Sequence, residues 1–251
     1  MSLTDDILQL RIDFEVYIDN ALSIVTLHEN ILQIAQSKLT ATKESLLKLK
    51  VGGGTVNQIN QNIKLLNNLE NTSQILNQKE IIKEQVVVLL IGTLENYLGE
   101  IIKNIGNSQP ELFNFKNSDE RITFTQDMLK GGFKLGDAIL EHILNKNYSF
   151  QDLQSSLKVF DDYLSINIEL ENQFKDSLIL CAACRNIIVH NQSIINRQFM
   201  KQIRNTTYAH AFIQGDPLAI DDELIQSSKN AILEYADQLT AAVTDRDHAQ
   251  Y

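Results

Sequence analysis

The sequence contains few of the residues that break helices or cross-link chains. Its 251 residues include two prolines, ten glycines, two cysteines and no tryptophan. Because proline and glycine interrupt helices, their scarcity beside abundant leucine, isoleucine, asparagine and glutamine predicts an all-α fold. Two cysteines cannot form the disulfide framework of a small secreted protein, which fits a reducing compartment. We therefore expect a cytoplasmic protein.

The sequence also lacks a basic leader and a long apolar run. It begins Met1-Ser-Leu-Thr-Asp-Asp6, with acidic residues where a signal peptide carries basic ones. The most apolar run, residues 86–91, lies between Glu84 and Glu95. That run is far shorter than the ~20 residues needed to span a bilayer, so we expect no membrane association.

Positive charge is scarce overall but is concentrated in one window. The chain has 32 acidic residues against 22 lysines and arginines, a formal net charge of −10. A protein that coats nucleic acid passively is basic, so the overall charge argues against that class. Between Asp176 and Asp216, however, there is no carboxylate. That window holds Arg185, His190, Arg197, Lys201, Arg204 and His210. It is either a locally positive surface or a chance cluster.

Hydrophobic periodicity predicts helices along most of the chain. They are expected at 4–49, 56–71, 79–105, 118–130, 134–146, 151–164, 169–192 and 222–243. Val51-Gly-Gly-Gly-Thr55 is expected to separate the first two helices, and Gly215-Asp-Pro217 to form a turn. Residues 208–213 alternate weakly, which is compatible with an extended segment. Residues 1–78 are thus expected to form a helical hairpin or coiled-coil arm, and residues 79–251 the main domain.

Two of these helices carry apolar stripes. In the helix at 79–105 the stripe follows the 3.6-residue helical period through Val87, Leu90, Leu94, Leu98, Ile101 and Ile105. The first helix has apolar residues at heptad a and d spacing: Ile7, Leu10, Phe14, Tyr17, Ala21, Ile24, Ile31 and Ala35. The first helix is therefore expected to pack either in a coiled coil or on its own domain.

The helix at 169–192 ends with Cys181-Ala-Ala-Cys-Arg-Asn-Ile-Ile-Val-His-Asn191. Its core stripe is expected at Leu180, Cys184, Ile187 and Ile188. Asn186 and His190, four residues apart, then share the opposite face. Arg185 lies about 140° from His190 around an ideal helix. If Arg185 and His190 act at one site, either the helix distorts or ends near His190, or two copies of the chain share the site across a two-fold axis.

The Arg185-Asn-Ile-Ile-Val-His190 segment resembles the R-x4-6-H signature of the HEPN superfamily. Leu94-Glu-Asn-Tyr-Leu98 resembles the first core helix of that superfamily, which often carries an acidic residue near the cleft. Gly215-Asp-Pro-Leu-Ala-Ile220, followed by an amphipathic helix, resembles the usual end of these domains. The resemblance covers roughly residues 79–245, leaves 1–78 unmatched, and implies a HEPN-like helical bundle.

The resemblance implies a metal-independent endoribonuclease, of the toxin or antiviral-defence kind, that acts as a homodimer with one shared cleft. The candidate catalytic residues are Arg185, Asn186, His190 and Glu95. An imidazole can accept the proton of a ribose 2′-hydroxyl near neutral pH, and a guanidinium can stabilise charge on the phosphate. The candidate RNA-binding residues are Arg197, Lys201 and Arg204. No cofactor or metal is implied.

The expected partners are the RNA substrate, a second copy of the chain and a cognate antitoxin or defence-system protein. Some toxins of the superfamily carry a tyrosine two residues past the histidine, which a partner nucleotidyltransferase modifies. This chain has Gln192 there, which leaves inhibition by direct protein binding as the open route.

Three alternatives stand beside the nuclease hypothesis. The chain could be a non-catalytic interaction or scaffold module that uses its N-terminal arm, or a nucleotide-binding sensor of the same fold. Arg185 and His190 could also be a solvated pair on an amphipathic helix, and Arg197, Lys201 and Arg204 a solvated helix face. Cys181 and Cys184 form a single pair rather than the two pairs of a zinc ribbon, so we expect them to be core residues.

Overall fold

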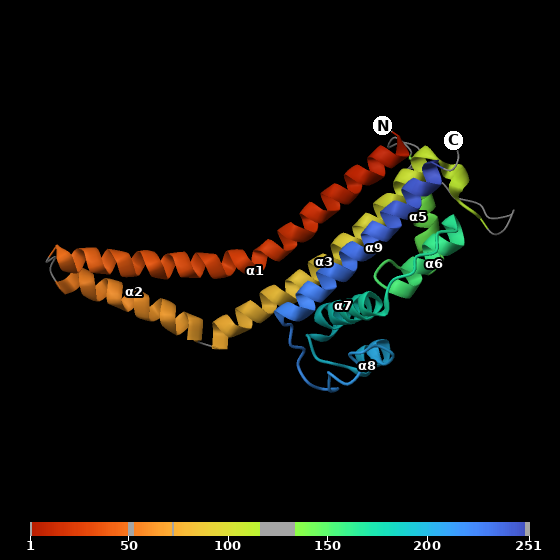
Figure 1. The fold of residues 1–251 in the computed structure, drawn as a ribbon. Helices are drawn as coiled ribbons and strands as arrows, with labels where there is room; N and C mark the ends of the chain where they lie inside the picture. The colour runs from red at the N-terminus through yellow and green to blue at the C-terminus, as the bar shows by residue number, and fades with distance from the viewer. Residues whose placement is uncertain (1, 50–52, 72, 116–133, 249–251) are drawn as a thin grey trace. The chain divides into compact units, whose positions relative to one another are not determined.

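The computed structural model describes residues 2–49, 53–71, 73–115 and 134–248 (Figure 1). Helices make up 79% of the described residues, and no strand occurs in these four ranges. A single bridge there, between Ile194 and Pro217, pairs two loop segments. The predicted all-α fold class is confirmed.

The chain divides into two compact units. The first unit contains Met1–Asp19 and Val87–Tyr251, and the second contains Asn20–Val86. The sequence analysis had instead divided the chain at residues 78 and 79. The start of the first helix belongs to the larger unit because Ile7, Phe14 and Ile18 are buried, with the Phe14 ring stacked on Tyr97 at a centroid distance of 4.4 Å.

The smaller unit contains most of α1 (Leu3–Lys48), all of α2 (Gly53–Asn71) and the start of α3 (Ser73–Ser108). Within this unit, α2 runs back along the second half of α1 (Figure 1). Gly53 and Gly54 belong to α2, and Val51 and Gly52 lie outside the described residues. Four α1 residues at 3-4-3 spacing have exposed apolar side chains: Ile24, Leu27, Ile31 and Ile34.

The apolar stripe predicted for α1 was wrong in part. Leu3, Ile7, Phe14, Ile18 and Ala21 are buried, whereas the predicted Tyr17, Ile24 and Ile31 are exposed. Both residues three and four positions after Phe14 are large and apolar, so spacing alone could not choose between Tyr17 and Ile18. Burial of Ile18 leaves the tyrosine, which carries a polar hydroxyl, at the surface.

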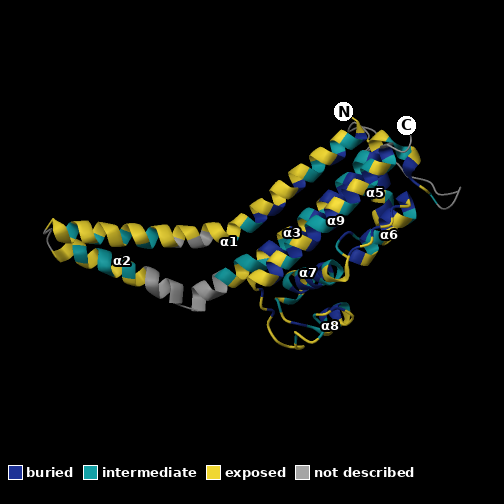
Figure 2. Cartoon of the chain, in the orientation of Figure 1, coloured by how far each residue is buried: buried dark blue, intermediate teal, exposed yellow. Residues whose placement is uncertain are grey.

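The larger unit is built around α3 and α9 (Asp222–His248). The predicted stripe of α3 is confirmed, since Val87, Leu90, Leu94, Leu98, Ile101 and Ile105 are all buried (Figure 2). A short 3₁₀ helix, η1 (Pro110–Leu112), follows α3. The unit also contains α5 (Leu135–Asn145), α6 (Leu153–Leu164), α7 (Asn172–Asn191) and α8 (Arg197–Ile203).

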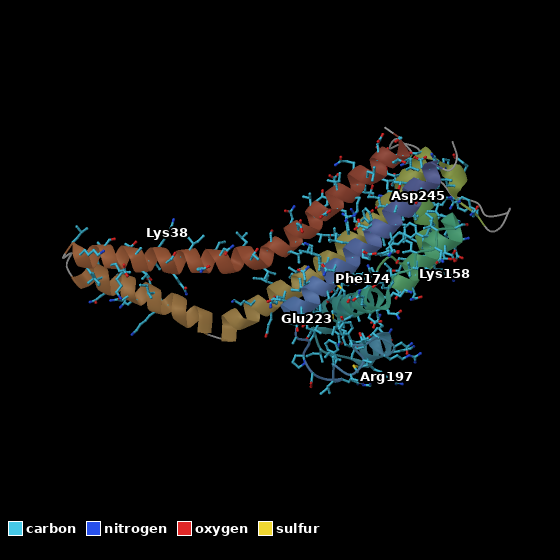
Figure 3. All side chains as sticks on the ribbon, in the orientation of Figure 1. Lys38, Lys158, Phe174, Arg197, Glu223 and Asp245 are labelled. Atoms are coloured by element: carbon cyan, nitrogen blue, oxygen red, sulfur yellow. The ribbon has the colours of Figure 1, made fainter. Side chains whose placement is uncertain are left out.

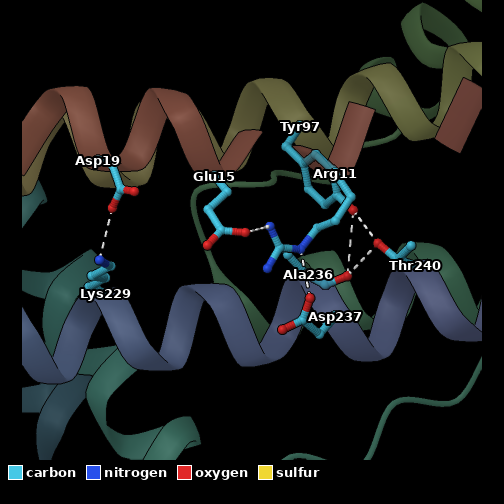
Figure 4. A network of polar contacts seen from close by, with 8 residues as sticks. All are labelled: Arg11, Glu15, Asp19, Tyr97, Lys229, Ala236, Asp237 and Thr240. Atoms are coloured by element: carbon cyan, nitrogen blue, oxygen red, sulfur yellow. Dashed lines mark hydrogen bonds and ion pairs between the residues drawn. The ribbon is translucent and has the colours of Figure 1, made fainter. Parts of the chain in front are cut away.

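Polar contacts hold the first turns of α1 against α9 (Figure 4). Arg11 pairs with Asp237 at 2.7 Å, and Lys229 pairs with Asp19 at 2.9 Å. At the start of α1, the buried Asp247 carboxylate accepts hydrogen bonds from the backbone N–H and the hydroxyl of Thr4, at 3.2 and 2.6 Å. This carboxylate satisfies an N–H that the first turn of a helix leaves without an intrahelical partner.

Other predicted elements had different outcomes. The helix expected at 118–130 lies outside the described residues. Residues 208–210 form a turn and Ala211 a bend, with the Ala211 N–H donating to the Tyr208 carbonyl, and residues 212–213 form no strand. Gly215 has a φ of 96° in the predicted turn, and Asp221 caps α9 by accepting from the Leu224 N–H at 2.7 Å.

Among the described residues, the stretch Lys79–Ser108 of α3 is long and apolar enough by composition to cross a membrane. However, 56% of its most apolar window is buried inside the protein. The core helix of a soluble protein has the same composition, so this helix is compatible with a soluble protein and is weak evidence for a membrane span.

Candidate functional site

Helix α7 carries the Arg-Asn-Ile-Ile-Val-His segment, and packing of its buried side chains holds the helix in place. It packs against α6, α8 and α9. Its buried residues are Ser177, Leu178, Leu180, Cys181, Ala182, Ala183, Cys184 and Ile187. The helix ends at Asn191 because Gln192 and Ser193 are both left-handed, with φ of 53° and 59°. The N–H groups of these two residues donate to the Ile187 carbonyl, which closes the helix end.

The three motif side chains have different environments. Arg185 and Asn186 are half-buried, and the Arg185 guanidinium donates to the Asn186 side-chain oxygen at 3.3 Å. His190 is exposed in the last turn of α7. Within the described residues, no hydrogen bond or ion pair engages its imidazole. Asn186 therefore contacts Arg185 rather than His190, although an ideal helix places it on the His190 face.

Arg185 and His190 lie on one unbroken stretch of α7. Helix α7 continues past His190 to Asn191, so no break in the helix separates the two residues. Five positions of an α-helix correspond to about 140° of rotation and about 7.5 Å of rise. The two side chains therefore leave the helix in different directions. The helix end that was expected near His190 is present, since α7 ends at Asn191, one position after His190. A site shared between two copies of the chain is the other expected route.

Glu95 is half-buried on α3 and contacts Gln151, in the loop between α5 and α6. Both of its carboxylate oxygens accept hydrogen bonds from the Gln151 side-chain amide, at 3.1 Å each. Gln151 and Ala182 line the same small cavity. Ala182 lies one helical turn before Asn186. The Glu95–Gln151 pair is thus next to α7, but its described contacts include neither Arg185 nor His190.

The basic residues predicted to bind RNA lie on and just after α8. Arg197, Lys201 and Arg204 are all exposed, and their spacing of four and three residues puts them on one face. Arg197 is labelled in Figure 3. Asn196 caps α8 by accepting from the Phe199 N–H at 2.9 Å. Phe199 and Ile203 are buried beneath the helix. The buried side chains therefore orient α8 so that its cationic face meets solvent.

The two cysteines of α7 are completely buried. Burial raises the pKa of Cys181 to about 11 and that of Cys184 well above its ordinary value. Neutral, inaccessible thiols are poor nucleophiles and poor metal ligands. In the described part of the chain, no group of three or more histidine, cysteine or carboxylate side chains is arranged to hold a metal ion.

The sequence analysis missed two cavities in the larger unit, of about 470 and 300 Å³. They lie at α7, α9 and the segment 207–221 that precedes α9, and no lysine, arginine or histidine lines either. The glycine and proline of 215–217 did predict a turn. They could not show that the chain folds back against α7. Carboxylates in the lining disfavour a nucleotide phosphate in these cavities.

Comparisons with models of protein families, with curated proteins and with solved structures each found no match.

Proposed function

We propose that the protein is a metal-independent endoribonuclease, with a HEPN-like larger unit and a cleft formed by two copies of the chain. The observation that carries this proposal is the position of His190. Its imidazole is exposed at the end of a well-packed helix, in the stretch of 39 residues between Asp176 and Asp216 that has no carboxylate. A histidine exposed in such a stretch is open to an RNA backbone, and no carboxylate near it in the sequence repels the RNA.

In the proposed reaction, the His190 imidazole accepts the proton of a ribose 2′-hydroxyl. The 2′-oxygen then forms a bond to the adjacent phosphorus, and the bond from phosphorus to the 5′-oxygen breaks. The leaving 5′-oxygen takes a proton from water or from an imidazolium. The products are a 2′,3′-cyclic phosphate and a 5′-hydroxyl. DNA lacks the attacking hydroxyl and is not cut.

Arg185 is proposed to stabilise the extra negative charge on the phosphate, because a guanidinium stays charged and presents several N–H donors. The contact from Asn186 restrains that guanidinium. Since Arg185 and His190 diverge on one helix, we propose that the arginine of one copy acts with the histidine of the other. The paired Glu95 and Gln151 are proposed to support α7 from the side of Ala182.

The cationic face of Arg197, Lys201 and Arg204 is proposed to hold RNA phosphates outside the cleft. The partners in this proposal are RNA, a second copy and an inhibitory protein such as an antitoxin, all in the cytoplasm. The biological role proposed is that of a toxin or an antiviral effector.

The test is an assay on RNA with EDTA present, comparing wild type with His190→Ala and Arg185→Ala. We expect each variant to cut at least about 100-fold more slowly, because each removes a group that acts in the transition state. Arg246→Ala is the matched control, since Arg246 lies on α9 outside the motif, and it should cut like wild type. An RNA oligonucleotide with a single 2′-deoxy sugar at the cleavage position should survive.

Cleavage that persists at the wild-type rate in both motif variants would exclude Arg185 and His190 as catalytic residues. Intact RNA at concentrations where light scattering shows a dimer would favour a second candidate, a non-catalytic interaction module. The exposed Ile24, Leu27, Ile31 and Ile34 favour that candidate, because such a stripe is typical of a helix that packs on another helix.

A further inference from the structure

The two cavities beside α7 adjoin each other, because Tyr208 and Ser227 line both. Together they border α7, α9 and the segment 207–221. The larger volume, about 470 Å³, falls in the range of sites that hold small organic molecules. None of the proposed catalytic or RNA-binding residues lines either cavity.

Backbone hydrogen bonds fix one wall of the larger cavity. The Ile195 N–H donates to the Asp216 carbonyl at 2.9 Å, and the Gly215 N–H donates back to the Ile195 carbonyl at 2.8 Å. The Leu218 N–H donates to the Ser193 carbonyl at 2.7 Å. The φ of 96° at Gly215, which side chains disfavour, permits the reversal between these bonds. The wall is thus held in place in the free protein, so a ligand need not order it.

The lining combines an apolar surface with aromatic rings. Leu180, Ile195 and Leu224 provide buried apolar side chains, and Tyr208 and Phe212 provide half-buried rings. The hydroxyls of Tyr208 and Ser177 hydrogen bond to each other at 3.2 Å at the junction with the smaller cavity. Apolar and aromatic walls of this kind favour a ligand with a hydrocarbon part, and aromatic faces also attract cations.

The charge of the lining is of one sign. Asp216, Asp221 and Glu223 line the larger cavity, and Asp176 lines the smaller one. Glu223, which lines the larger cavity, and Phe174, which lines the smaller one, are labelled in Figure 3. Since no lysine, arginine or histidine lines either cavity, the carboxylates have no cation within the lining. A cationic ligand would supply the missing charge, and an anionic one would be repelled.

We propose that this double cavity binds an organic cation, namely an alkylammonium group attached to a hydrocarbon chain. The hydrocarbon lies against Leu180, Ile195 and Leu224, and the ammonium group lies among the carboxylates and the rings of Tyr208 and Phe212. The site is independent of RNA cleavage, so its test does not depend on the proposed nuclease activity.

The test uses three probes of equal chain length, n-hexylammonium, n-hexanol and n-hexanoate, titrated into the full chain and followed by NMR. We expect hexylammonium to bind most tightly, hexanol several-fold more weakly and hexanoate not at all. The double variant Asp216→Asn, Glu223→Gln should weaken hexylammonium binding by about three- to tenfold, from the typical strength of exposed ion pairs. Ala211→Trp, which fills the larger cavity, should abolish binding of all three probes.

The matched control for charge is Asp161→Asn, Asp245→Asn, which removes two exposed carboxylates that line neither cavity. Hexylammonium should bind this variant as it binds wild type. Equal weakening in both double variants, or equal binding of hexanoate and hexylammonium, would overturn the proposal. Blocked lysine methylamide extends the test. Binding as tight as that of hexylammonium would assign the cation to a lysine side chain of a protein, and weaker binding would assign it to a free amine.

Discussion

From Ser177 to Cys184, α7 is buried on nearly every side, whereas from Arg185 to Asn191 only Ile187 is buried. Residues 177–184, here called the first half of the stretch from Ser177 to Asn191, are apolar or small. Residues 185–191, its second half, include an arginine, two asparagines and a histidine. Packing against α6, α8 and α9 explains the first half completely. It does not explain the second, because half-buried or exposed positions accept most polar residues. The chemistry proposed for this helix therefore belongs to its last two turns.

The largest expected effect concerns a mixture of two inactive variants. If the arginine of one copy acts with the histidine of the other, a dimer of Arg185→Ala with His190→Ala contains one complete site. When equal amounts of the two variants exchange subunits at random, half of the dimers contain one subunit of each variant. Each mixed dimer has one complete site of the two in a wild-type dimer, so about a quarter of wild-type activity should return. Each variant alone should stay at least about 100-fold below wild type. RNA cleavage by the mixture measures this recovery.

The control for that experiment is a mixture of His190→Ala with the double variant Arg185→Ala, His190→Ala, which has no complete site in either arrangement. It should remain inactive. If the first mixture also remains inactive while subunit exchange is verified with labelled chains, the arginine and histidine do not act across the dimer.

The next largest effect concerns RNA binding by the cationic face of α8. Replacing Arg197, Lys201 and Arg204 with glutamine should weaken RNA binding about tenfold at moderate salt. It should also make the slope of log affinity against log salt shallower by about 2, since each lost phosphate contact on single-stranded RNA accounts for about 0.7. Filter binding at several salt concentrations measures the slope. Lys38→Gln, Lys43→Gln, Lys48→Gln makes the same charge change elsewhere. An equal change in slope in both triple variants would mean that net charge, rather than this face, governs binding.

A smaller effect tests the contrast in packing. Ala183→Leu adds volume at a position that is fully buried and should lower the free energy of unfolding by about 1–3 kcal/mol. Val189→Leu adds one methylene to a side chain that is 47% exposed, and should change the free energy of unfolding by less than about 0.5 kcal/mol. Urea unfolding measures both values. Similar losses in the two variants would show that the last turns of α7 are as tightly packed as its first half, for example against a second copy.

The sequence predicted those features that depend on periodicity and local turn chemistry. The α3 stripe from Val87 to Ile105 follows from residue spacing, and the start of α9 at Asp222 was expected from the sequence. Spacing could not choose between Tyr17 and Ile18, because that choice depends on which partner helix is present. The contact of Arg185 with Asn186 depends on side-chain conformation. The cavities depend on how residues 207–221 fold back against α7, which no local pattern records.

The smallest effect is the pH dependence of the buried half of α7. Burial raises the pKa of Cys181 to about 11, so its thiol ionises later in the folded chain than in the unfolded one. The unfolded state is then favoured increasingly as pH rises from about 9 to about 11. Stability should fall by about 1 kcal/mol more between pH 8 and pH 10 in wild type than in Cys181→Ala, as measured by urea unfolding at each pH. Equal dependence of stability on pH in the two proteins would mean that the Cys181 thiol reaches solvent. The difference in packing between residues 177–184 and residues 185–191 would then be smaller than the burial of Cys181 indicates.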